Sequence, residues 1–194
     1  MNAPDAQPDE TLALVARAQA GEETAFGALM RLHYEPTFRT VYAIVHNEHD
    51  ARDICQEVWL TVWKELKNFR GASKFTTWVH PIAVRKALDH LRKRRRWYDR
   101  FLPFASPGED HPGVAEPATH TTARDEAESS ERSARLHRAL AALPPKLRAA
   151  LTLRELQGFS YEEVAAALSL PVGTVMSRLY HARRQLAQKF KETP

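Results

Sequence analysis

Residues 73–96 carry an apolar pattern that predicts a buried helix with a strongly basic end. Apolar side chains recur every four residues, the ridge spacing of an α-helix, at Phe75, Val79, Ala83, Ala87 and Leu91. Further apolar residues flank this ridge on both sides, so the helix must pack between neighbours. Five consecutive cationic residues, 92–96, end the stretch and must face water or an anion. Taken alone, this run fits a solvated helix end as well as a surface that binds nucleic acid.

The distribution of charge along the 194 residues favours the nucleic-acid interpretation. The formal net charge is only +4, but residues 76–100 carry 8 Lys and Arg against 2 Asp and Glu, and residues 146–194 carry 8 against 4. Between these blocks, residues 101–131 carry 1 against 7. Two basic blocks separated by an acidic one predict two contacts to a polyanion, joined by a segment that avoids it.

The chain is predicted to be all-α, because no period-two apolar alternation of a β-strand occurs in it. We expect two small helical domains, residues 11–96 and 131–190. A disordered tail is expected over residues 1–10, and a flexible acidic linker over residues 97–130 because that stretch is rich in proline and acids. No stretch is apolar enough for membrane insertion, and the acidic N-terminus does not have the pattern of a signal peptide. The single cysteine, Cys55, fits a cytoplasmic location.

Residues 50–66 predict a helix with one apolar and one polar face. The apolar face holds Ala51, Cys55, Val58, Trp59, Val62 and Leu66. The opposite face carries Asp53, Gln56 and Glu57, with the apolar Leu60 among them. An acidic, amide-bearing face with an apolar centre has the make-up of a partner-docking patch, and an ordinary solvated face is the alternative.

Residues 131–190 predict a helix-turn-helix. Ser160 and Glu163 have the spacing of a capping box at the start of a short helix, and a turn ending in Pro171 leads to a longer helix from Val172 to about Phe190. On that helix the inward stripe is Val175, Leu179, Ala182 and Leu186. The outward face holds Gly173, Thr174, Ser177, Tyr180, His181 and Arg184, with Arg178 and Arg183 on its flanks. Small, hydroxyl-bearing and cationic side chains suit a DNA major groove, and a plain helical hairpin is the alternative.

No cofactor, metal site or catalytic group is expected. His46, His49 and Cys55 lie close in sequence, but the chain has no HExxH or paired CxxC pattern. Cys55 falls on the apolar face and is expected to be part of the core rather than a nucleophile. A zinc-dependent enzyme or sensor is the third class of function, and elemental composition of the purified protein distinguishes it.

Three stretches in this order resemble the extracytoplasmic-function (ECF) subfamily of bacterial RNA polymerase sigma factors: residues 50–66, 69–96 and 143–186. The resemblance implies a non-enzymatic subunit that binds core RNA polymerase, recognises promoter DNA and initiates transcription of a specific, stress-responsive regulon. It also implies an anti-sigma factor as a partner. The alternative is a stand-alone helix-turn-helix regulator that does not bind polymerase as a sigma subunit, which has no need for the polar face of residues 53–60.

The resemblance also implies the contacts of each region. Sigma region 2 docks on the clamp coiled coil of the largest polymerase subunit, here through Asp53, Gln56, Glu57 and Leu60. The loop of residues 69–75 and the helix after it recognise and melt the minus-ten element. The residues assigned to that role are Phe69, Arg70, Ser73, Lys74, Phe75, Trp78, Arg85, Arg92 and Arg95. Sigma region 4 contacts the β flap on one face and reads the minus-thirty-five element on the other. The residues assigned to that reading are Thr174, Ser177, Arg178, Tyr180, His181 and Arg184.

Three residues depart from the usual pattern of the subfamily. Arg85 stands where relatives often have Asn, and Pro81 lies inside the helix. Met176 stands where many relatives carry Arg or Lys, so one expected phosphate or guanine contact is missing.

Overall fold

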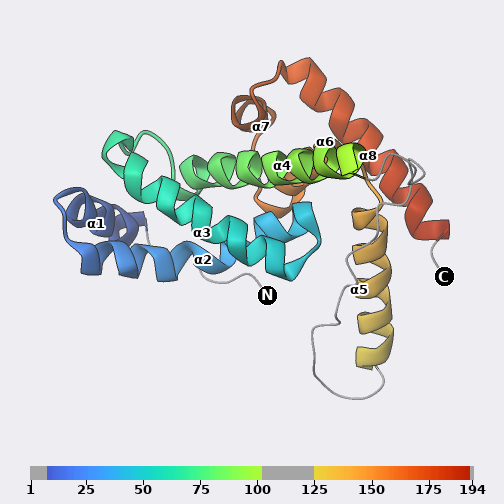
Figure 1. The fold of residues 1–194 in the computed structure, drawn as a ribbon, viewed down its shortest axis with the longest axis horizontal. Coiled ribbons are helices and arrows are strands. Elements are labelled where there is room, and N and C mark those ends of the chain that lie inside the picture. Colours follow the sequence, from blue (N-terminus) through green and yellow to red (C-terminus); the bar gives the residue numbers. More distant parts are fainter. Residues whose placement is uncertain (1–7, 102–124, 193–194) are drawn as a thin grey trace.

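The computed structural model describes residues 8–101 and 125–192, and Figure 1 shows their helices. The first group is α1 (Pro8–Gln19), α2 (Glu23–Val45), α3 (Glu48–Glu65), the 3-10 turn η1 (Leu66–Asn68) and α4 (Phe75–Phe101). The second group is α5 (Asp125–Ala141), α6 (Pro145–Leu151), the π-helical turn η2 (Thr152–Leu156), α7 (Tyr161–Leu168) and α8 (Val172–Glu192). No strand occurs within these two stretches, and the all-α prediction is confirmed.

Local signals in the sequence set several of the helix ends. Asn47 caps α3, since its side-chain oxygen accepts a hydrogen bond of 2.8 Å from the Asp50 amide. The predicted capping box of α7 is present, with the Glu163 amide donating to the Ser160 hydroxyl and the Ser160 amide donating to the Glu163 carboxylate. Gly158 has a φ of +70° and lets the chain turn sharply between η2 and α7.

Three helices extend into stretches that the sequence predicted to be tail or linker. α4 continues to Phe101 and α5 begins at Asp125, so helix occupies both ends of the stretch 97–130 that was predicted to be a linker. Likewise, α1 begins at Pro8, inside the predicted tail. Extending an existing helix adds a backbone hydrogen bond per residue without the cost of a new nucleus, so polar residues beside a packed helix can join it. The rest of the predicted tail and linker lies outside the described residues.

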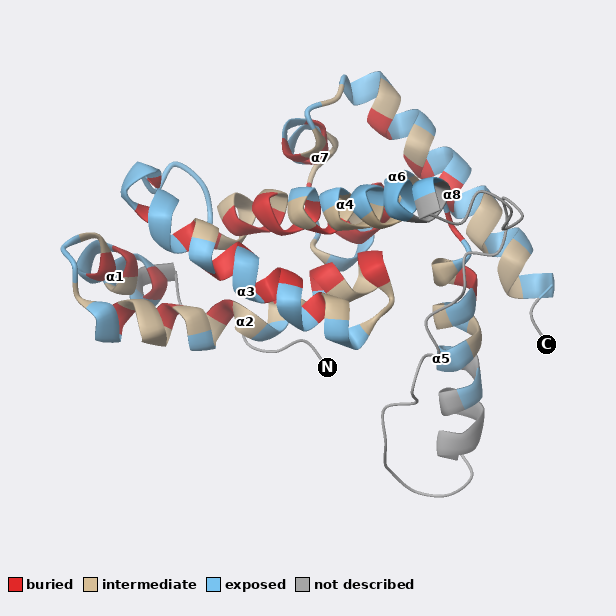
Figure 2. Cartoon of the chain, in the orientation of Figure 1, coloured by how far each residue is buried: buried red, intermediate tan, exposed pale blue. Residues whose placement is uncertain are grey.

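α2 is the centre of the first helical group and contacts α1, α3 and α4. Figure 2 shows the buried residues as stripes along α2, α3 and α4. The ridge predicted on α4 is buried at Phe75, Val79, Ala83 and Ala87, and Leu91 packs at its edge. The inward face predicted for residues 50–66 is buried at every position. The four-residue spacing therefore identified the core side of both helices correctly.

The two helical groups pack directly against each other. α2 contacts α5, α6 and η2, while α4 contacts α6 and α7. The side-chain amide of Gln157 donates a hydrogen bond of 2.9 Å to the Thr40 hydroxyl, and the His80 and Phe159 rings lie 6.0 Å apart. The sequence predicted both groups of helices but not this contact, which makes one continuous core.

Candidate polymerase and promoter interfaces

The polar face of α3 is exposed along its length. Asp53, Gln56 and Glu57 are all exposed, and Leu60 is 61% exposed although it is apolar. Glu57 lies 3.4 Å from the Lys86 ammonium of α4, so α4 borders this face. The other side of α3 is fixed in the core, where burial raises the pKa of the Cys55 thiol to about 12. Such a thiol is a core residue and a poor nucleophile, as its position on the apolar face predicted.

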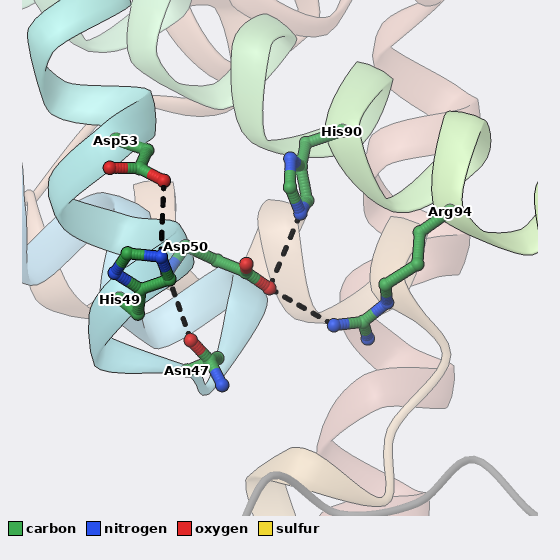
Figure 3. A network of polar contacts seen from close by, with 6 residues as sticks. All are labelled: Asn47, His49, Asp50, Asp53, His90 and Arg94. Atoms are coloured by element: carbon green, nitrogen blue, oxygen red, sulfur yellow. Dashed lines mark hydrogen bonds and ion pairs between the residues drawn. The ribbon is translucent and has the colours of Figure 1, made fainter.

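A polar network joins the start of α3 to the basic end of α4 (Figure 3). Arg94 donates a hydrogen bond of 3.1 Å to the Asp50 carboxylate, and His90 Nε2 lies 3.2 Å from the same oxygen. The carboxylate is mostly covered, whereas the neighbouring pair of His49 and Asp53, 3.6 Å apart, is exposed. Asp50 therefore fixes where the basic end of α4 lies relative to α3.

The other basic side chains assigned to α4 face outward. Arg85 is exposed, and its Nε donates a hydrogen bond of 3.2 Å to the Pro81 carbonyl. Arg92 is exposed and paired with Asp89 one turn earlier. Arg95 is exposed as well. The backbone of α4 is continuous through Pro81, so these cations share one helix with the buried ridge.

The loop before α4 divides its predicted contact residues into two kinds. Arg70, Ser73 and Lys74 are exposed, whereas Phe69 is only 5% exposed and Phe75 only 3%. The rings of Phe69, Phe75 and Trp78 lie 5.3–5.9 Å from one another. Phe69 and Phe75 thus form an aromatic support beneath the loop, and Trp78 is the half-buried member of the group.

A hollow of about 230 Å³ lies beside this loop, and the sequence did not reveal its α1 wall. Its lining is Leu12, Val15, Ala16, Gln19, Phe69, Arg70 and Gly71. Gln19 donates hydrogen bonds of 2.8 Å to the carbonyls of both Leu66 and Phe69, which holds the loop against α1. Leu12 is 45% exposed and lines the hollow together with Val15 and Ala16 of the same helix.

The outward face predicted on α8 is accessible. Ser177, Tyr180, His181 and Arg184 are exposed, and Thr174 and Arg178 are half-buried. The inward residues Val175, Leu179 and Ala182 are buried, which confirms the predicted stripe. Arg183 is anchored by the Glu155 carboxylate, 2.6 Å away, so this flanking cation ties α8 to η2.

Histidines lie where the two helical groups meet, a feature that the sequence did not predict. Burial, with Arg148 and His137 nearby, lowers the pKa of His46 to about 3. Burial, with His33 nearby, lowers the pKa of His80 to about 4. Both side chains are therefore neutral at pH 7. In the part of the chain that the structure describes, no three His, Cys, Asp or Glu side chains form a group that could hold a metal ion.

Two family models match the chain. The model of Sigma-70 region 2 matches residues 29–97, and that of Sigma-70, region 4 matches residues 133–186. The RNA polymerase sigma-H factor of Pseudomonas aeruginosa is 36% identical over 178 residues, covering 89% of this chain and 90% of that protein. The ECF RNA polymerase sigma-E factor of Escherichia coli K12 is 34% identical over 176 residues, covering 91% and 92%. The chain belongs to the ECF sigma factors.

Membership of the ECF sigma factors favours a sigma subunit over a stand-alone helix-turn-helix regulator. A sigma factor acts with RNA polymerase in transcription initiation and is not an enzyme. Among the described helices of this ECF sigma factor, none combines the length and apolar character needed to cross a membrane.

Solved structures share the fold of this ECF sigma factor. CnrH, solved with the cytosolic domain of CnrY, matches with a TM-score of 0.64 at 23% identity, covering 95% of this chain and 99% of CnrH. RpoE of Bartonella quintana, solved with the anti-sigma factor NepR, matches with a TM-score of 0.67 at 22% identity, covering 86% and 96%.

Proposed function

We propose that this sigma factor docks on core RNA polymerase through the exposed face of α3 formed by Asp53, Gln56, Glu57 and Leu60. The exposed side chain of Leu60, set among acidic and amide groups, is the observation that carries the proposal. An apolar residue at the centre of a polar patch gains from being covered by a partner. The polymerase element that covers this face is the clamp coiled coil of the largest subunit.

The second part of the proposal is that the loop of residues 69–75 and α4 melt the minus-ten element. Arg70, Ser73 and Lys74 supply exposed polar and cationic contacts, and the hollow beside the loop receives an unpaired base. Because Phe69 and Phe75 are buried, we assign them to supporting the loop instead of stacking on bases. The outward cations of α4 contact the strand phosphates.

The third part is that α8 reads the minus-thirty-five element in the major groove. The side chains in this role are Thr174, Ser177, Arg178, Tyr180, His181 and Arg184. The opposite face of the same helical group meets the β flap, and residues 102–124 connect the two DNA-binding surfaces.

Regulation follows from the same proposal. The Bartonella relative was solved bound to an anti-sigma factor, and we assign a partner of that kind to this chain. This partner would bind the sigma factor in the cytoplasm and keep it from docking on polymerase. A stress signal would release the sigma factor, which would then direct transcription of a specific regulon.

Charge reversal on α3 tests the docking surface. Glu57→Lys is expected to abolish binding to core polymerase, measured by fluorescence anisotropy of the labelled chain, without unfolding a protein in which Glu57 is exposed. Glu65→Lys, the same charge change on another side of α3, is the matched control and should bind normally. Normal polymerase binding and run-off transcription by Glu57→Lys would refute this surface.

A further inference from the structure

An apolar hollow of about 480 Å³ lies on the surface formed by α7 and α8. Its lining is Tyr161, Met176, Leu179, Tyr180, Arg183 and Arg184. Tyr180 and Arg184 also belong to the face of α8 assigned above to the major groove, so the hollow continues that face towards α7. Leu179 forms its floor from the core, where it is buried.

The rim of this hollow is an exposed apolar pair. Met176 is 54% exposed and Tyr180 is 61% exposed. The two residues are four positions apart on α8, the separation at which neighbouring side chains on one helix face meet. Exposing so much apolar side chain to water is unfavourable. A ligand that is apolar where it touches Met176 and Tyr180 would remove this surface from water and would bind favourably.

One of the two arginines that line the hollow is already paired with a carboxylate. Two Arg183 nitrogens lie 2.6 and 3.2 Å from the Glu155 carboxylate, so the guanidinium is engaged by η2. Met176 offers only a weakly accepting sulfur and cannot donate a hydrogen bond. Met176 therefore cannot recognise a guanine edge by donating a hydrogen bond, and it can recognise a base only through apolar contact with a group of matching shape.

In the major groove, the 5-methyl group of thymine is the apolar feature that a base edge presents. We propose that Met176 and Tyr180 determine sequence specificity by packing against the 5-methyl group of a thymine in the upstream promoter element. This inference rests on the proposed function, since it assigns one base contact to the helix that reads the duplex. It also gives Met176 a role in place of the hydrogen-bonding contact that a cationic residue would make there.

Replacing thymine by uracil, with deoxyuridine in place of thymidine in the DNA, tests this contact because the two bases differ only in the 5-methyl group. Holoenzyme is formed from core polymerase and the full chain, and a bound promoter is selected from a random library. Each thymine of its upstream element is then replaced by deoxyuridine in turn. Wild-type holoenzyme should lose about fourfold in affinity at one position, the change expected for one buried methyl group.

Three variants locate the contact on the protein. Met176→Ala should bind the thymine promoter more weakly and should no longer distinguish deoxyuridine at that position. Met176→Leu keeps an apolar side chain and should keep the discrimination, which separates lost contact from lost folding. Gln188→Ala, a change at an exposed position of α8 outside the residues assigned to the groove, should discriminate like the wild type.

The possible outcomes separate this inference from the function on which it rests. If wild-type holoenzyme binds the promoter specifically but no deoxyuridine changes its affinity, the methyl contact is wrong and the promoter-reading role stands. Equal discrimination by Met176→Ala and the wild type would show that Met176 does not contact the methyl group and would also overturn the inference, which requires both Met176 and Tyr180. Failure of the wild-type holoenzyme to select any promoter would overturn the proposed function itself.

Discussion

The side-chain amide of Gln157 donates a hydrogen bond of 2.9 Å to the hydroxyl of Thr40, which lies 117 residues earlier in the chain. This bond joins the residue that follows η2 to α2, and so joins the two helical groups that carry the proposed DNA-binding surfaces. Elements centred at minus ten and minus thirty-five lie about 85 Å apart along a duplex at 3.4 Å per base pair. Helices packed on one continuous core cannot reach across that separation, so we expect the Gln157–Thr40 contact to break when both elements are bound.

Crosslinking across this contact should block transcription reversibly. A chain carrying Thr40→Cys and Gln157→Cys is joined with a bismaleimide whose spacer contains a disulfide. Run-off transcription with core polymerase should fall at least tenfold, an order-of-magnitude expectation for losing one of two linked contacts, and it should recover when the spacer is reduced. Cys55 can stay in place because its buried, high-pKa thiol reacts poorly.

The controls for this experiment are the two variants that carry only one of the introduced cysteines, Thr40→Cys or Gln157→Cys, treated with the same reagent. Both should transcribe as well as the untreated chain. Full activity of the crosslinked double variant would mean that the packed arrangement itself serves at the promoter.

Acidification should weaken the packing between the helical groups. The pKa values of His46 and His80, about 3 and about 4, lie below the ordinary histidine value, so the packed state favours the neutral rings. Stability from these rings is complete above about pH 6.5 and declines as the pH falls towards 4, because only the unpacked state then binds protons. Each ring contributes a loss of up to about 1.4 kcal/mol per pH unit in that window.

Urea unfolding measured at pH 7.5 and pH 5 checks this expectation. The free energy of unfolding should fall at pH 5, and the fall should shrink in His46→Gln. His49→Gln, a change at an exposed histidine outside the contact, is the control. The same pH dependence in all three proteins would show that His46 does not cause it.

Truncating Phe75 and truncating Arg70 should have different effects on the free energy of unfolding and on promoter opening. Phe75→Ala removes a buried ring and is expected to destabilise the protein by about 3–5 kcal/mol. Arg70→Ala changes an exposed side chain and should alter the free energy of unfolding by less than about 0.5 kcal/mol, while reducing promoter opening. Urea unfolding and permanganate reactivity of unpaired thymines measure the two effects. Normal opening by Arg70→Ala would remove the loop from the proposed melting surface.

Asp50→Asn should loosen the basic end of α4. The substitution weakens the carboxylate contacts to His90 and Arg94, which are partly covered, and we expect a loss of about 1 kcal/mol in the free energy of unfolding. Glu48→Gln, which removes an exposed pair with Arg52, should cost less. Paired urea titrations distinguish the two variants, and equal losses would mean that burial adds nothing to the Asp50 network.

Periodic and local features were predictable from the sequence. The four-residue spacing from Phe75 to Ala87 encodes which side of α4 is buried, and the capping box of Ser160 and Glu163 encodes where α7 begins. Both signals act within one or two helical turns, so neighbouring residues carry all the information needed to read them.

Contacts between distant segments were not predictable in this way. An aromatic residue in a polar loop, such as Phe69, can face a nucleic acid or turn inward, and only the packing of α1 and α4 around it decides. The bond from Gln157 to Thr40 depends on how two helical groups dock, which no periodic pattern records. The hollow that Met176 lines could not be predicted either, because its lining includes Tyr161 of a different helix.

The two hydrogen bonds from Gln19 to the carbonyls of Leu66 and Phe69 have a practical consequence for anyone who shortens this protein. The match to Sigma-70 region 2 starts at residue 29, inside α2, so a fragment cut to that boundary would lose α1 and residues 23–28 of α2. It would also lose the side-chain donor to these two carbonyls and one wall of the hollow. We expect such a fragment to bind polymerase normally yet open promoters poorly, a defect easily misattributed to the loop itself.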